Sequence, residues 1–192
     1  MKIKNIIISA LVVLGFTSFS GIANAKCGKL VIAEQNWASA ELMANVDKII
    51  LEEGYGCDVE LVPGATMPTF TSMNDKGSPD MNPEQWANAV YTPLKKAVSE
   101  KRLIIANGAP ITGLGEGWWL NPAALKKHPE LKGMTAVQIL DRPDLFPDKE
   151  DSSKGAFMGC PAGWGCQLAN ANLFRAFEME KKGWVLIDPG SA

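Results

Sequence analysis

Histidine is nearly absent from this sequence. The only one is His128, which stands between Lys127 and Pro129 in a polar stretch. A hydrolase triad needs a histidine positioned by an acid, and a zinc site needs several histidine or cysteine ligands at set spacing. We expect His128 to be a solvated surface residue. The sequence therefore favours a protein that is not an enzyme and that has no metal and no cofactor.

Long apolar runs are also missing. The apolar run at residues 6–16 is too short for a membrane-spanning helix, which needs about 20 apolar residues. Lys2 and Lys4 give it a positive start, and Ala23-Asn24-Ala25 fits the small-x-small rule for signal-peptide cleavage. We interpret residues 1–25 as a signal peptide cleaved after Ala25, which predicts a periplasmic protein.

Basic side chains are too few for a nucleic-acid surface. Without Lys2 and Lys4 the chain keeps 17 Lys and Arg against 21 Asp and Glu, a net charge of −4. Proteins that bind nucleic acid carry a basic patch or stripe. We therefore expect no nucleic-acid partner.

Cysteine occurs only four times. An even number in an exported chain favours disulfides, with buried free thiols as the alternative. Cys160 and Cys166 are close enough to bridge a single turn, and we predict that they pair. Cys27 and Cys57 begin two strands that we expect to be neighbours, so a second bridge between them is also predicted.

Short strands and helices alternate along the chain. The residue pattern predicts a strand at 29–33, a helix at 39–53 and a strand at 57–62, which form a parallel pair with a right-handed crossover. Further helices are predicted at 67–73, 90–100, 122–127, 135–140 and 167–182, and further strands at 80–81, 103–106, 117–121, 156–159 and 185–187. This order predicts an α/β fold with mainly parallel sheets.

Tryptophan is abundant, with six in the chain. Trp37, Trp86 and Trp164 lie in loops after predicted strands, where ligands of parallel sheets bind. A quaternary ammonium ion has no N–H donor, so aromatic faces are suited to surround it, at about 0.5–2 kcal/mol per contact. These residues predict a cage for such a cation. The alternative is that they pack the cores of loops.

The segment Cys160-Pro-Ala-Gly-Trp-Gly-Cys166 precedes a predicted long helix. Backbone N–H groups near Gly165 and Cys166 would then point out of its first turn, where they suit a carboxylate. One short element would offer an indole face and an anion site. This combination predicts a zwitterionic ligand with a trimethylammonium head and a carboxylate tail.

This motif resembles that of the glycine-betaine and proline-betaine binding proteins of ABC importers. The Asn36-Trp37 pair and the segment Asp80-Met-Asn-Pro-Glu-Gln-Trp86 are also similar to this family and its choline-binding relatives. The resemblance covers almost all of the chain after the signal peptide.

The resemblance implies a role for each of six residues. In the family, tryptophans at the positions of Trp86 and Trp164 wall the ammonium pocket. In the choline-type relatives, aromatic residues at the positions of Trp37 and Trp118 also contribute to this pocket. The backbone amides matching Gly165 and Cys166 carry the carboxylate.

The resemblance also implies a two-lobed periplasmic binding protein fold of type II. We expect lobe I at residues 26–107 and lobe II at 108–192, with the ligand between them and hinge closure around it. The implied partners are a quaternary ammonium solute and an ABC permease in the inner membrane. The protein itself is expected to be a monomer.

Two departures from the family pattern affect these expectations. The family fold continues well beyond Ala192, so we expect lobe II to be incomplete and the chain to bind poorly. Some relatives have a histidine where this chain has Val90. Glycine betaine, proline betaine and choline all stay open as ligands. Another small solute such as an amino acid, or a secreted hydrolase, are the alternatives.

Overall fold

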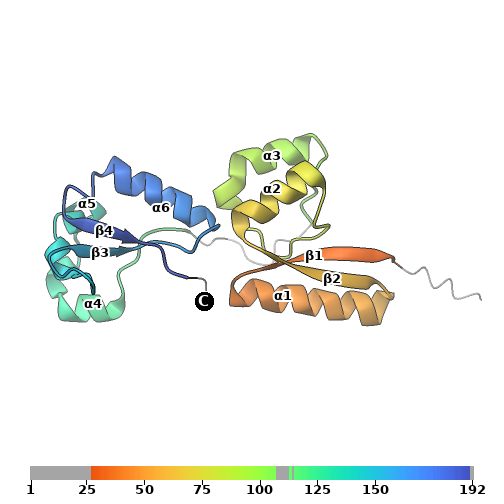
Figure 1. Ribbon diagram of the computed structural model, residues 1–192, viewed down its shortest axis with the longest axis horizontal. Helices are drawn as coiled ribbons and strands as arrows, with labels where there is room; N and C mark the ends of the chain where they lie inside the picture. The colour runs from red at the N-terminus through yellow and green to blue at the C-terminus, as the bar shows by residue number, and fades with distance from the viewer. Residues whose placement is uncertain (1–26, 107–112, 114, 191–192) are drawn as a thin grey trace, which may run out of the picture.

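The computed structural model describes residues 27–106, 113 and 115–190. Figure 1 shows the elements gathered in two bodies, one built from β1 to α3 and the other from α4 to β4. The signal peptide and the crossing between lobes expected at residues 107–108 lie outside the described residues. Within the described part of the chain, no helix is long and apolar enough to cross a membrane.

The first body is built around a parallel pair of strands. β1 (Lys29–Gln35) pairs with β2 (Asp58–Gly64). The connection between them consists of α1 (Ala38–Ile49) and the short π-helix η1 (Ile50–Gly54). Ile32, Ala44 and Val59 are buried between this pair and α1. The predicted strand–helix–strand unit is confirmed, and it brings the carboxyl ends of both strands to one edge.

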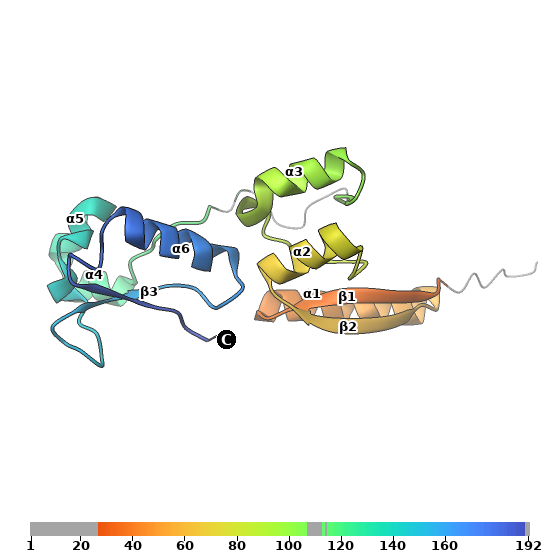
Figure 2. The same ribbon diagram turned by 45° about the horizontal axis from the view of Figure 1, so that its top comes forward.

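Three more helical elements complete this body: α2 (Thr66–Lys76), η2 (Ala87–Val90) and α3 (Tyr91–Ser99). In Figures 1 and 2, α1 lies on one side of the β1–β2 pair, and α2 and α3 lie on the other. The segment at Asp80 and Met81 runs beside β1 as a single parallel bridge, with the Ala33 N–H donating to the Met81 carbonyl at 2.8 Å. The predicted strand at 80–81 is thus reduced to a bridge.

The second body is built around another parallel pair, β3 (Gly155–Met158) and β4 (Trp184–Ile187). Its helical elements are α4 (Pro122–Lys127), η3 (Pro129–Leu131), α5 (Ala136–Leu140), η4 (Pro143–Leu145) and α6 (Gly165–Ala176). Leu140, Met179 and Trp184 are its buried core. The predicted α/β organisation with parallel strands is therefore confirmed in both bodies.

Both predicted disulfides are present. Cys27 is bonded to Cys57, joining the beginnings of β1 and β2 with a Cα–Cα distance of 4.7 Å. Cys160 is bonded to Cys166, with a Cα–Cα distance of 5.9 Å, and closes the loop between β3 and α6.

Several sequence-based expectations were wrong. The segments 103–106 and 117–121 are not strands, because no neighbouring strand pairs with them in the described residues, and Ile104 is 92% exposed. Helix α6 ends at Ala176 instead of continuing to residue 182. Two residues after that end, Glu178 has a left-handed φ of 52°, and the chain then turns to bury Met179.

His128 is also less exposed than expected. Only 18% of its side chain is accessible, and its Nδ1 lies 3.5 Å from Glu130. Its Nε2 is buried without a hydrogen-bond partner in the described part of the chain. Within the described residues, no group of three or more acidic, histidine or cysteine side chains could hold a metal ion.

Candidate ligand-binding site

Two tryptophans of the first body share one carboxylate oxygen. Trp37 follows the carboxyl end of β1 as the N-cap residue of α1, and Trp86 immediately precedes η2. The indole N–H of Trp37 donates to Glu84 Oε1 at 2.8 Å, and that of Trp86 donates to the same atom at 2.9 Å. Glu84 therefore links two side chains that are far apart in sequence.

The segment that carries Glu84 is held by hydrogen bonds to the last residue of β1. Gln35, which is 0% exposed, donates from Nε2 to Asn82 Oδ1 at 2.7 Å and to the Glu84 carbonyl oxygen at 2.9 Å. Asn82 in turn donates to Gln85 Oε1 at 2.7 Å. These contacts fix the backbone of residues 82–85 at the end of the strand.

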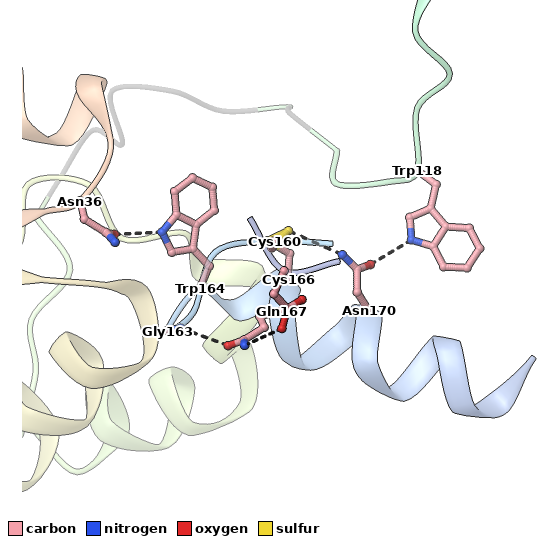
Figure 3. The surroundings of a disulfide bond; sticks show 9 residues. Asn36, Trp118, Cys160, Gly163, Trp164, Cys166, Gln167 and Asn170 are labelled. Atoms are coloured by element: carbon pink, nitrogen blue, oxygen red, sulfur yellow. Dashed lines mark hydrogen bonds between the residues drawn. A yellow bond between two sulfur atoms is a disulfide. The ribbon is translucent and has the colours of Figure 1, made fainter. Parts of the chain in front are cut away.

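Trp164 reaches the first body from the second. It is the N-cap residue of α6, and its indole N–H donates to Asn36 Oδ1 at 2.9 Å, as Figure 3 shows. Its ring meets that of Trp37 edge to face, with centroids 5.3 Å apart and an interplanar angle of 73°. An arrangement of this kind is favoured by the quadrupoles of the two rings. The two bodies thus touch through their tryptophans.

Glycines allow the disulfide-closed loop to approach the first body. Gly163 has a φ of +85°, and its carbonyl oxygen accepts the Met67 N–H at 3.0 Å. A Cβ atom added at Gly165 would lie only 2.1 Å from the Cβ of Ala89. Such a distance is impossible without movement, so the close contact depends on glycine at this position.

The first turn of α6 offers unused hydrogen-bond donors. The N–H groups of Gly165 and Cys166 have no partner among the described residues. The N-terminus of a helix carries a partial positive charge, which favours an anion there. No acidic side chain lies in this first turn to occupy the donors.

A cleft of about 1290 Å³ brings these groups together. Its lining includes every residue that the sequence indicated for the ligand: Trp37, Trp86, Trp118, Trp164, Gly165 and Cys166. Much of the remaining lining comes from the second body, including Leu140, Phe157 and Trp184. The candidate site is the end of this cleft where the first body meets the α6 loop.

Trp118 differs from the other tryptophans of the cleft. Its ring packs against Phe157 and Phe177, with centroids 5.0 and 5.9 Å away. Its indole N–H donates to Asn170 Oδ1 at 2.9 Å (Figure 3). Trp118 is therefore packed against the core of the second body as well as lining the cleft.

Sequence reasoning missed Glu84 and Asn36, which orient the tryptophans. Each lies in a segment that the sequence analysis singled out without giving this residue a role. A signal for Glu84 was its position two residues before Trp86, whereas Asn36 accepts from Trp164, 128 positions away. The indole N–H of a buried tryptophan usually finds a hydrogen-bond acceptor, so an acceptor side chain close in sequence is a candidate for that partner.

Comparison with known families gives one match. The model of the family described as the substrate-binding domain of ABC-type glycine betaine transport systems matches residues 28–192. Comparison with curated proteins gave no match. The family has the type II periplasmic binding fold, which agrees with the α/β organisation and the parallel strands described above. The chain therefore belongs to the family of substrate-binding domains of ABC-type glycine betaine transport systems.

Proposed function

We propose that this protein binds a quaternary ammonium solute, namely glycine betaine, proline betaine or choline, at the Trp37–Trp86–Trp164 end of the cleft. The observation that carries the proposal is the edge-to-face contact between Trp37 and Trp164, beside free backbone donors at the start of α6. The family supports a receptor for glycine betaine transport, and the site chemistry supports the class of ligand.

The tryptophans supply the contacts for the cation. A trimethylammonium group offers only C–H surface with spread positive charge, so it gains by lying against the negative faces of indole rings. Trp86 is 40% exposed, so it has surface free to meet a ligand. Its N–H is held by Glu84, which leaves the ring face for the cation.

The first turn of α6 supplies the contact for a carboxylate. The N–H groups of Gly165 and Cys166 belong to the same loop as Trp164, so the two halves of a betaine would be held by one element. Charge-assisted hydrogen bonds of this type are stronger than those between neutral groups. Choline has no carboxylate, so this contact separates the two kinds of ligand.

The transport role follows from the family. The receptor would be exported with residues 1–25 as its leader, cleaved after Ala25, and would act in the periplasm as a monomer without catalysing a reaction. Lobe I at 26–107 and lobe II at 108–192 would close on the solute and present it to an ABC permease. The contacts of Trp164 with Asn36 and Trp37 support closure across this site.

A titration panel tests the ligand class. We expect at least one of glycine betaine, proline betaine and choline to change the tryptophan fluorescence of the chain at a lower concentration than unmethylated glycine does. Glycine has N–H donors that an aromatic cage does not satisfy. Binding of glycine as tight as that of every methylated ligand would support an amino-acid receptor and contradict the proposal.

A further inference from the structure

Glu84 enters the binding scheme above only as the acceptor for the Trp86 indole, although its side chain links two of the tryptophans. Its Oε1 accepts the indole N–H groups of both Trp37 and Trp86. Its Oε2 is buried and has no hydrogen-bond partner in the described residues. Glu84 itself does not line the cleft, and it lies at the N–H edges of the two rings.

No cationic side chain in the described part of the chain forms an ion pair with this carboxylate. Among the described residues, none of the ion pairs includes Glu84. A buried carboxylate oxygen without a partner lowers the stability of the folded protein. The fully buried Gln35 nevertheless holds the backbone of this residue in place. The fold thus holds an acidic side chain at the N–H edges of two tryptophans that wall the cleft.

We propose that Glu84 is a positioning residue that fixes the orientation of Trp37 and Trp86 and makes the cleft prefer a cation to a neutral molecule of the same shape. This inference rests on the proposed function, because it assumes that a cation binds at these tryptophans. It adds a source of selectivity that is absent from the cage itself.

The physical basis is the polarisation of the indole rings. An indole N–H that donates to a carboxylate shifts electron density toward the ring, since hydrogen bonds polarise the groups they join. A more negative ring face attracts a cation more strongly and leaves an uncharged ligand almost unaffected. The carboxylate charge also acts directly on the ligand through a medium of low dielectric constant.

Two substitutions separate position from charge. Glu84→Gln keeps the length of the side chain and a carbonyl oxygen that can accept both indole N–H groups, but it removes the charge. Glu84→Ala removes both. Glu53→Gln is the matched control, because Glu53 is exposed on the π-helix η1 and does not line the cleft.

The orienting role is tested without ligand. We expect Glu84→Ala to reduce the near-ultraviolet circular dichroism of the tryptophans, and Glu84→Gln and Glu53→Gln to retain it. The far-ultraviolet spectrum checks that each variant is folded. A near-ultraviolet spectrum of folded Glu84→Ala equal to that of the wild type would overturn the orienting role.

The charge is tested with choline and 3,3-dimethylbutan-1-ol, which has carbon in place of the ammonium nitrogen. We expect Glu84→Gln to weaken choline binding about three- to tenfold while binding of the neutral alcohol stays the same. Glu53→Gln should change neither. An unchanged ratio of the two affinities in Glu84→Gln would overturn the role of the charge, even if Glu84→Ala fails to fold.

Ligand binding by the wild-type protein distinguishes failure of the proposed function from failure of the inference about Glu84. If it binds no methylated ammonium ligand, the proposed function fails and the inference about Glu84 fails with it. If it binds choline or glycine betaine and Glu84→Gln keeps the wild-type ratio of affinities, only the inference fails.

Discussion

The indole N–H of Trp164 donates to the side-chain oxygen of Asn36, although 128 positions separate the two residues in sequence. This hydrogen bond joins the loop before α6 to the end of β1. It places the indole edge-on to Trp37. The geometry of the site therefore depends on a polar contact that crosses from one body to the other.

Loss of this contact should weaken ligand binding. We expect Asn36→Ala to reduce affinity for glycine betaine by about 1 kcal/mol, because the Trp164 N–H loses its acceptor in a half-buried position. Asn36→Asp keeps an acceptor oxygen and should retain binding. Isothermal titration calorimetry of both variants gives the comparison. Equal affinities for the alanine variant and the wild type would show that the hydrogen bond has no role in binding.

Truncation of the cage tryptophans should reduce affinity more than stability. Trp86→Ala and Trp164→Ala are each expected to weaken binding of glycine betaine by about 1–3 kcal/mol, from lost cation–π contact and lost burial. Tyr55→Ala is the control, because Tyr55 is 65% exposed, directly follows η1 and does not line the cleft. Fluorescence or calorimetric titration measures the effect. Wild-type affinity in both tryptophan variants would place the ligand elsewhere.

A single methyl group at Gly165 should force the two bodies apart. The added Cβ would meet the Ala89 Cβ at 2.1 Å, and overpacking of this kind costs about 1–3 kcal/mol. We expect Gly165→Ala to lose affinity by this amount. The double variant Gly165→Ala with Ala89→Gly removes the opposing Cβ and should recover part of the loss. No recovery in the double variant would show that Gly165 acts for another reason, such as access to its N–H.

Trp184 is expected to matter for stability because it belongs to the core of the second body. It is 4% exposed, and its indole N–H donates to the Leu140 carbonyl oxygen at 2.7 Å. Trp184→Ala should lower the free energy of unfolding by about 3–5 kcal/mol. Trp184→Phe keeps most of the buried surface and should cost less. Urea unfolding followed by circular dichroism measures both, and equal midpoints for Trp184→Ala and the wild type would contradict this assignment.

The two disulfides should have different roles. The bridge between Cys27 and Cys57 spans 30 positions and that between Cys160 and Cys166 spans six, so loop-closure entropy predicts stabilisation of about 4 and about 2 kcal/mol. Serine at both positions of the first pair should therefore cost more stability. Serine at both positions of the second should cost more affinity, because Trp164 lies inside that loop. The reverse ranking of affinities would contradict this view.

The sequence predicted the parallel strand–helix–strand unit and the gathering of tryptophans at one cleft because both depend on local signals. Trp37 and Trp164 stand where a strand ends in a polar loop, and chain topology brings such ends together. The strands expected at 103–106 and 117–121 failed for a different reason. An apolar run such as that around Ile104 matches a strand locally, but a strand needs a partner, and local pattern does not reveal whether one is present.

The long-range partners of the orienting groups could not be predicted from local patterns. Glu84 meets Trp37 across 47 positions, and no periodicity links the two residues. The hydrogen bond between Trp118 and Asn170 spans 52 positions. It joins the Trp118 indole to α6, so this residue is part of the second body as well as of the cleft wall. Side-chain partners of this kind depend on the assembled fold, whereas loops, caps and cysteine spacing can be recognised along the chain.

The short disulfide loop makes the position of Trp164 depend on the redox state of the protein's surroundings. Thiols in the cytosol stay reduced, so a newly made chain there has Cys160 and Cys166 unjoined and the segment carrying Trp164 without its covalent closure. Such a chain would hold solute weakly. Oxidation to the disulfide completes this arrangement, so the loop that carries Trp164 closes in full only where the surroundings allow disulfides.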